Sequence, residues 1–191
     1  YQWKKADKSI LFEGAQGSML DVDFGTYPFV TSSNTTTAGV CTGLGIAPQH
    51  IKKVIGIAKA YCTRVGNGPF PTELDNEVGQ RLRDIGGEYG ATTGRPRRCG
   101  WIDLVALKYA IMISGVTDLV ITKVDCLDAF EEIEACTHYM VDGKKMDYLP
   151  FDIVKQEVTP VYEKIKGWNQ TVTTDIPADL DKYLTYLERE L

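Results

Sequence analysis

An apolar run at residues 118–122, Asp-Leu-Val-Ile-Thr, most constrains how this chain can fold. Consecutive Leu, Val and Ile are typical of a strand that is buried on both faces of a parallel sheet. Parallel strands need crossover connections, usually helices, and helical patterns alternate with strand patterns over the first two thirds of the chain. We therefore predict an α/β fold, with a mainly parallel sheet and flanking helices.

The other elements follow from turn signals and apolar spacing. Short runs predict strands at 9–12, 27–31 and 60–65, and the Ser-, Thr- and Gly-rich residues 32–45 predict a loop. Helical spacing occurs at 48–58, 74–85, 101–113 and 180–187. A hairpin around Asp142-Gly143, within residues 133–148, adds a smaller antiparallel region. Because no linker or repeat divides the chain, we expect residues 1–191 to belong to a single domain.

Composition argues against several classes of protein. The formal net charge is −5, from 21 basic and 26 acidic residues, whereas a general nucleic-acid binder carries a basic surplus. No apolar run reaches the ~20 residues of a membrane-spanning helix. The five cysteines are scattered without a Cys-x-x-Cys pair, as is typical of reduced thiols in the cytosol. We expect a cytoplasmic protein that binds neither nucleic acid nor a membrane.

Residues 122–125, Thr-Lys-Val-Asp, follow the apolar strand, where open α/β sheets bind their ligands. At this place the carboxylate of Asp125 can accept two parallel bonds from N1 and N2 of guanine, a pair that adenine lacks on that edge. The aliphatic stem of Lys123 can lie on the face of the ring. The alternative is a plain strand end with a surface lysine and a helix-capping aspartate.

Residues 91–98, Ala-Thr-Thr-Gly-Arg-Pro-Arg-Arg, place three arginines within four positions of an acidic chain. Guanidinium forks match the oxygens of carboxylates and phosphates. Pro96 restricts Arg95 to an extended backbone, which fans the arginine side chains apart. This segment predicts an anion site, and the alternative is a solvated loop whose arginines pair with surface carboxylates.

The remaining polar segments predict less. A tight turn at 14–17 presents Gln16, whose carboxamide suits a phosphate, a base edge or solvent, and Asp21 with Asp23 is a candidate metal site. No Gly-x-x-x-x-Gly-Lys-Ser/Thr phosphate loop is present. A guanine-binding aspartate without such a loop is half a nucleotide site, and the chain starts at Tyr1, before any methionine. We therefore expect a piece of a longer protein.

Taken together, eight segments resemble the adenylosuccinate synthetase family in order and spacing, until the likeness fades after about Tyr148. They are FEGAQG at 12–17, GTYP at 25–28, VTSSNTT at 30–36, TRVG at 63–66, GPFPTE at 68–73, GATTGR at 90–95, RRCGW at 97–101 and TKVD at 122–125. The resemblance implies a nucleotide-hydrolase-like domain, here incomplete. It also implies a ligase that joins IMP to L-aspartate with GTP and Mg²⁺ in AMP biosynthesis. In such a ligase GTP phosphorylates the 6-oxygen of IMP, and the amine of aspartate then displaces phosphate.

The resemblance also assigns roles to residues of this chain. Gln16, Thr31 and the backbone of Val65 would bind IMP. The aspartate substrate would be held by the loop formed by Ala91, Thr92, Thr93, Gly94 and Arg95. GTP would be bound through its phosphates by Arg97 and through its base by Lys123, Val124 and Asp125.

Several parts of the family pattern are absent from this sequence. They are the N-terminal phosphate loop with its catalytic Asp, the later catalytic His, the C-terminal guanine contacts and an Arg donated across the homodimer. We therefore expect the central to C-terminal part of the enzyme. It would contain no catalytic acid or base, would leave most Mg²⁺ ligands elsewhere, and would be inactive alone.

Two other functions stay open at this point. A guanine-nucleotide-binding module without ligase chemistry needs only residues 122–125, and it predicts GTP binding that is indifferent to IMP and aspartate. A nucleic-acid binder would use the arginines of residues 91–98, but the acidic total disfavours it.

Overall fold

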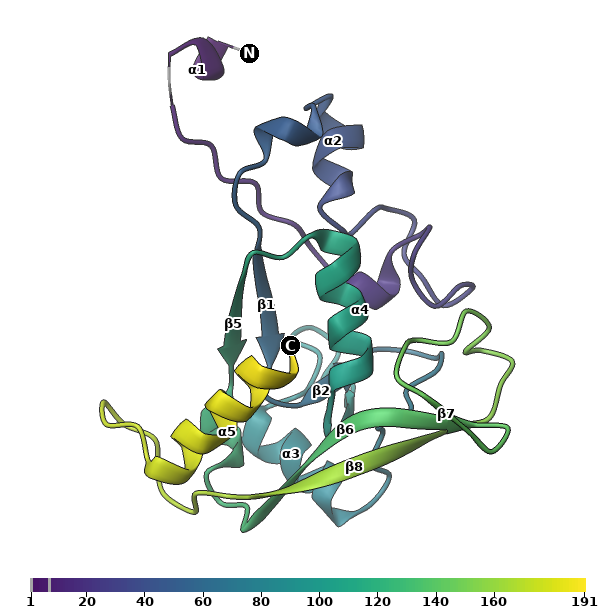
Figure 1. The fold of residues 1–191 in the computed structure, drawn as a ribbon, viewed down its shortest axis with the longest axis vertical. Coiled ribbons are helices and arrows are strands. Elements are labelled where there is room, and N and C mark those ends of the chain that lie inside the picture. Colours follow the sequence, from purple (N-terminus) through teal and green to yellow (C-terminus); the bar gives the residue numbers. More distant parts are fainter. Residues whose placement is uncertain (1, 7) are drawn as a thin grey trace.

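A computed structural model describes residues 2–6 and 8–191 of the chain (Figure 1). The helices are α1 (Gln2–Lys5), α2 (Ala38–Leu44), α3 (Glu77–Gly86), α4 (Leu104–Ser114) and α5 (Ala178–Glu190). The strands are β1 (Ile55–Lys59), β2 (Cys62–Arg64), β3 (Arg98–Gly100), β4 (Ile102–Asp103), β5 (Asp118–Thr122), β6 (Glu132–Val141), β7 (Lys144–Met146) and β8 (Val158–Lys166). Three short 3₁₀ turns are η1 (Ser18–Leu20), η2 (Pro48–His50) and η3 (Val124–Leu127).

The predicted strand at 118–122 is β5, and its parallel partner is β1. The expectation that this strand is buried on both faces is wrong: among the described residues β5 pairs with β1 in a two-stranded sheet, and Val120 is 46% exposed. The register runs from Ile55 opposite Asp118 to Lys59 opposite Thr122, so both carboxyl ends lie at one edge. The helix predicted over 48–58 is wrong, since only the turn η2 is helical before β1 begins. The apolar residues of 51–58 fit either period, and pairing with β5 selects the strand.

A second sheet is built on the long strand β6. It pairs in parallel with β4 and antiparallel with β7 and β8. The predicted hairpin is confirmed: Asp142 and Gly143, with φ of 50° and 73°, form its turn. Two-residue hairpin turns of this kind need positive φ at both positions, which Asp-Gly supplies. The α/β fold with parallel pairing and an antiparallel hairpin region is confirmed.

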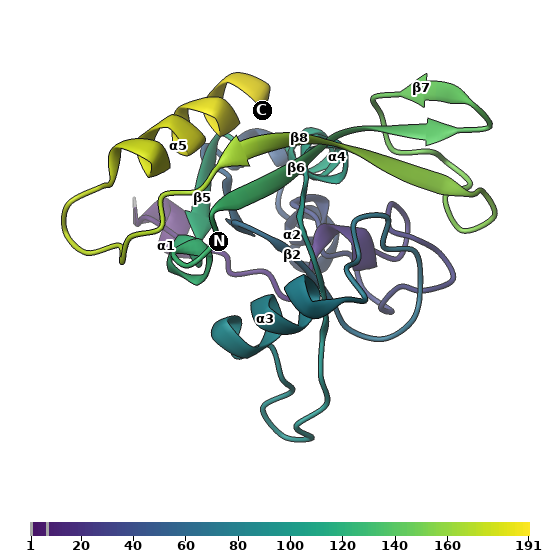
Figure 2. The ribbon, with the colours of Figure 1, turned by 90° about the horizontal axis from the view of Figure 1, so that it is seen from below.

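The core lies between this sheet and the helices. Figure 2 shows α5 and α3 on opposite sides of β6 and β8. Fully buried Tyr183 and Leu187 of α5 and Leu82 of α3 belong to one apolar cluster. In the same cluster, Trp101 meets Phe130 edge to face at 5.6 Å between ring centroids. None of the helices in the described part of the chain is long and apolar enough to cross a membrane.

Other sequence predictions meet the structure unevenly. The strand at 60–65 and the helices at 74–85 and 180–187 are confirmed as β2, α3 and α5. Residues 9–12 and 27–31 form no strand. In the second segment, turn bonds such as Phe29 N to Thr26 O take up backbone donors locally. The predicted loop at 32–45 contains α2. Within 101–113, Ile102 and Asp103 form β4, and α4 begins only at Leu104.

The carboxylate of Asp103 joins α4 to β6. It accepts bonds from Ala106 N at 3.0 Å, as the helix N-cap, and from Tyr139 OH at 2.6 Å, and Asp103 is only 4% exposed. Burial raises the pKa of this carboxyl. One buried side chain therefore satisfies a helix end and a core tyrosine.

We expect Asp103→Ala to lower the free energy of unfolding by about 2–4 kcal/mol, because it removes a helix cap and leaves the Tyr139 hydroxyl unpaired. Urea denaturation measures this loss. Tyr139→Phe is the matched control, since it removes one hydrogen bond and keeps the cap, and it should cost less. A loss for Asp103→Ala below about 0.5 kcal/mol, the usual limit for a neutral surface site, would contradict this account.

Candidate functional site

The carboxyl ends of β1 and β5 present two lysines. Lys59 is the last residue of β1, and Lys123 directly follows β5. Lys123 has a φ of 59°, an uncommon value for a residue other than glycine, and its Nζ donates to the Gly86 carbonyl. The turn η3 then begins, with Asp125 exposed in it. Parallel pairing thus places two ammonium groups and the exposed carboxylate of Asp125 at the same edge.

Glu88, just after α3, forms hydrogen bonds and ion pairs with the charged groups of this edge. Its Oε1 accepts from Lys59 Nζ at 2.7 Å and from Tyr61 OH at 2.6 Å, and its Oε2 accepts from Arg97 Nη1 at 2.8 Å. Lys123 Nζ lies 4.0 Å from Oε1. The Glu88 side chain is only 1% exposed. A single buried carboxylate therefore meets three cations, which leaves a local surplus of positive charge.

Burial disfavours the ionised form of Glu88, but its hydrogen bonds from Lys59, Tyr61 and Arg97 outweigh burial and hold its pKa below the ordinary value. Burial and the neighbouring Glu88 carboxylate raise the pKa of Tyr61, so this phenol stays a donor. The carboxylate is thus ionised, and the cluster is a positively charged site suited to an anion.

The arginine-containing loop folds as a hairpin-like excursion after α3. Tyr89 pairs with Pro96, and Gly90 N donates to Arg95 O at 2.9 Å. The tip, residues 91–95, is exposed and extends away from the body of the protein (Figure 2). Gly94, with a φ of 62°, forms the turn of the tip. Arg97 N then donates to Glu88 O at 2.9 Å, which closes the base of the loop.

The three arginines of the loop have different surroundings, as their predicted fanning requires. Arg95 lies at the exposed tip, whereas Arg97 binds Glu88. Arg98 forms a two-bond ion pair with Glu73 and donates to the carbonyls of Gly66, at 3.1 Å, and Gly68, at 2.9 Å. The alternative expectation, that the arginines pair with carboxylates, therefore holds for Arg98. Arg97 also pairs with a carboxylate, that of Glu88, but shares it with Lys59 and Lys123.

The predicted IMP residues lie on other loops. Gln16 is exposed in a left-handed turn with a φ of 61°, and Val65 is 65% exposed just after β2. Thr31 is half-buried, and its N donates to Leu20 O at 2.8 Å. Arg64 connects two of these loops, donating to Thr26 Oγ1 at 3.0 Å and to Asn67 O at 3.0 Å.

The candidate metal ligands Asp21 and Asp23 serve a different purpose. Asp21 is fully buried and accepts backbone N–H bonds from four residues of its own loop: Asp23, Phe24, Thr35 and Thr36. Burial opposes its ionisation, but these four bonds prevail and lower its pKa. Asp23 instead accepts from Asn34 at 2.6 Å. Within residues 2–6 and 8–191, no group of three or more His, Cys, Asp or Glu side chains could hold a metal ion.

The structure therefore brings Arg97 and Lys123 together through Glu88, a contact that sequence patterns did not indicate. Lys59, Tyr61 and Glu88 were missed. Lys59 was hidden by the wrong helix assignment, although a polar residue that closes a strand is a usable signal. Glu88 follows two glycines and precedes the arginine segment, which marks it as a candidate partner in an otherwise ordinary stretch.

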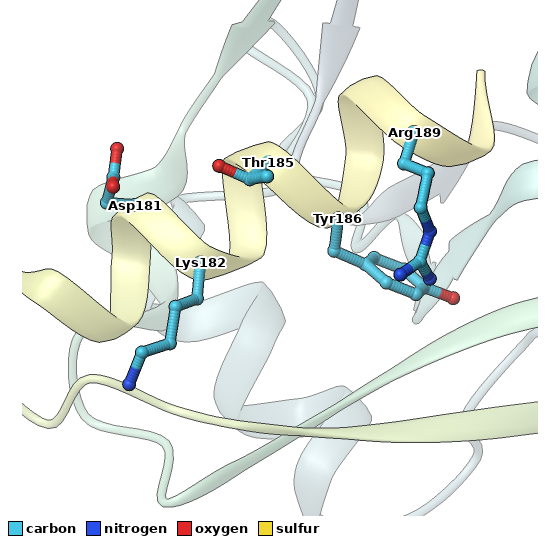
Figure 3. Close-up of a pocket in the computed structure, with 5 residues that line it drawn as sticks. All are labelled: Asp181, Lys182, Thr185, Tyr186 and Arg189. Carbon is cyan, nitrogen blue, oxygen red and sulfur yellow. The ribbon is translucent and has the colours of Figure 1, made fainter.

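A shallow hollow on α5 contains none of these residues (Figure 3). It is lined by Asp181, Lys182, Thr185, Tyr186 and Arg189. The Arg189 guanidinium lies over the Tyr186 ring, 5.3 Å from its centroid, and Tyr186 OH donates to Glu163 at 3.0 Å. These contacts engage Arg189 and the Tyr186 hydroxyl within the protein surface.

The parallel strand ends, the cation cluster and the exposed arginine tip form a positively charged site at the edge of an α/β sheet, which has the charge that suits an anionic ligand. The chain belongs to the adenylosuccinate synthetase family, whose family model matches residues 1–191. The expectation that the likeness fades after about Tyr148 is therefore wrong. It is 55% identical over 196 residues to the adenylosuccinate synthetase of Christiangramia forsetii, covering 100% of this chain and 46% of that protein. It is 59% identical over 192 residues to that of Phocaeicola vulgatus, covering 98% and 45%.

Among solved structures, the chain is similar to a fully ligated adenylosuccinate synthetase from Plasmodium falciparum. The TM-score is 0.94 at 44% identity, over 100% of this chain and 47% of that one. The chain thus spans about half the length of the relatives it matches.

The lowered pKa of Glu88 predicts a pH-dependent contribution to stability. Ionised Glu88 stabilises the fold above the ordinary glutamate value of 4.5, and this contribution is lost as pH falls through the lower folded-state pKa. We expect the difference in unfolding free energy between the unmodified protein and Glu88→Gln to shrink below pH 4.5. Urea denaturation from pH 7 to pH 3 measures it, and a difference independent of pH would contradict the assignment.

Proposed function

We propose that this chain is the central to C-terminal part of an enzyme that joins IMP to L-aspartate, using GTP and Mg²⁺, to form adenylosuccinate in AMP biosynthesis. The observation that carries the proposal is the cluster of Lys59, Arg97 and Lys123 around Glu88 at the carboxyl ends of β1 and β5. Family membership supports the ligase chemistry. The share of the relatives that is covered, 46%, supports the incomplete domain.

GTP would bind at the edge formed by β1 and β5. Asp125 is exposed there and has a carboxylate able to accept both N–H groups of the guanine edge, and Lys123 and Val124 precede it in the same turn. Arg97, with its guanidinium fixed on Glu88, would meet the phosphates. Charge complementarity between this cationic cluster and a triphosphate supports the assignment.

The acceptor substrates would bind on the neighbouring loops. Gln16, Thr31 and the Val65 backbone would bind IMP, and their loops are connected by the buried charges of Asp21 and Arg64. The exposed tip would hold L-aspartate through Ala91, Thr92, Thr93, Gly94 and Arg95. The Arg95 fork can pair two of its N–H groups with one carboxylate, which suits a dicarboxylic substrate.

The rest of the machinery would come from the remainder of the enzyme. The described residues contain no cluster of carboxylates fit for Mg²⁺, so the ion would be held largely by other segments, where it would offset phosphate charge. The same holds for the catalytic acid and base and for an arginine shared across a homodimer. We propose a cytoplasmic homodimeric enzyme.

Turnover by the isolated chain tests the proposal that the catalytic acid and base lie outside residues 1–191. We expect the full-length protein to form adenylosuccinate from IMP, L-aspartate and GTP with Mg²⁺, and residues 1–191 alone to form none, because the acid and base would lie elsewhere. Chromatographic detection of adenylosuccinate measures both. Product formation by residues 1–191 alone would disprove the assignment of the catalytic groups.

Arg95→Leu in the full-length protein separates the ligase from a guanine-binding module. We expect the KM for aspartate to rise about tenfold to a hundredfold, because a charge-assisted bond to the substrate is lost. The KM for IMP, measured in the same assay, is the internal control. A KM for aspartate unchanged by Arg95→Leu would contradict the assignment of this loop to the aspartate substrate, and GTP binding without any dependence on aspartate would favour the module without ligase chemistry.

A further inference from the structure

Glu88 contacts three separate segments of the chain: residues 59–61, the return of the arginine-containing loop, and the end of β5. Lys59 comes from β1, Tyr61 from the turn after it, Arg97 from the return of the arginine-containing loop, and Lys123 from the end of β5. Gly86 allows Tyr61 to approach, since a Cβ at that position would lie 2.2 Å from the Tyr61 hydroxyl. The carboxylate is therefore enclosed by side chains from segments that are far apart in the sequence.

Repulsion between the cations makes this carboxylate necessary. Lys59, Arg97 and Lys123 all lie within 4.0 Å of one or other oxygen of Glu88, so each is close to two like charges. Without the negative charge, the three groups would move apart toward solvent. Glu88 faces water with 1% of its side chain, whereas Arg97 and Lys123 are 35% and 39% exposed. The carboxylate is thus inaccessible to an anionic ligand, while the cations that it holds are accessible.

The contacts of Arg97 and Lys123 show how far their positions depend on Glu88. The Nε of Arg97 is buried without a hydrogen-bond partner within the described residues, so Nη1 on Glu88 fixes the guanidinium. Lys123, in its left-handed conformation, directs its ammonium group to Gly86 O and Glu88. These contacts hold the ammonium group of Lys123 at the end of β5, and Asp125 follows two residues later in η3.

We propose that Glu88 is a positioning residue for the guanine-nucleotide site, which sets Arg97 for the phosphates and Lys123 for the base without touching the nucleotide itself. This inference rests on the proposed function, since it concerns the GTP site assigned there. It predicts that loss of the Glu88 charge weakens GTP binding selectively. The IMP loops are held by Asp21 and Arg64 instead, so IMP binding should not change.

Glu88→Gln in the full-length protein tests the proposal. We expect the KM and Kd for GTP to rise about tenfold or more, because a charged hydrogen-bonding anchor is lost, while the KM for IMP stays within about twofold. Tyr61→Phe is the matched control. It removes a hydrogen bond from the same buried cluster but keeps all four charges, and we expect a Kd for GTP within about twofold of the unmodified protein. A merely structural role would lower kcat per total protein in both variants and leave the GTP constants unchanged.

Glu88→Asp keeps the experiment decisive if Glu88→Gln does not fold. The shorter side chain retains the charge but cannot span Lys59 and Arg97 together, so we expect a smaller rise in the Kd for GTP, about threefold to tenfold. An unchanged or lower Kd for GTP in the folded variants would overturn the proposal. Calorimetric titration with GTP needs no turnover, so this result is separate from failure of the proposed function, which would appear as no adenylosuccinate from the unmodified protein.

Discussion

Parallel pairing of β1 with β5 determines where the charged groups of the site lie. The ladder runs in register to Lys59 opposite Thr122 and continues through Ala60 N to Thr122 O at 2.9 Å. Both strands therefore end at the same level, and the residues that follow them share one edge. Every charge assigned to the nucleotide site is attached to this edge directly or held against it by Glu88.

Buried single charges organise the parts of the protein that have little regular structure. Asp21 closes its loop with four backbone N–H bonds, and Arg64 joins the loop at 26–29 to the turn at 66–68. Glu88 does the same for β1, β5 and the arginine-containing loop. Asp21 and Arg64 supply hydrogen bonds where their loops have no backbone ladder, whereas Glu88 attaches the arginine-containing loop to the paired strands β1 and β5. Buried charges are stable when their polar atoms are hydrogen-bonded.

The sequence patterns predicted those elements in which local signals agree. The apolar run at 118–122, the Asp142-Gly143 turn and the helical spacing of 180–187 each indicate one kind of element, and the strand, the turn and the helix are confirmed. The predicted burial of the strand on both faces is not, because burial depends on what packs against the sheet. The segment 48–58 carries apolar residues that fit both a helix and a strand, and the choice was decided by a partner 63 residues away in sequence, Asp118 opposite Ile55. Local sequence propensity contains no information about so distant a pairing partner.

The sequence by itself determined the kinds of groups available: three arginines in four positions, a lysine and an aspartate after an apolar strand, and eight segments that resemble one family. Only the tertiary structure decided which of them meet. It sent Arg98 to Glu73, joined Arg97 with Lys59 and Lys123 on Glu88, and used Asp21 to close a loop. The physical reason is that charge pairing inside a protein depends on distance and burial, and both are set by strand register and loop packing, which residue spacing along the chain does not encode.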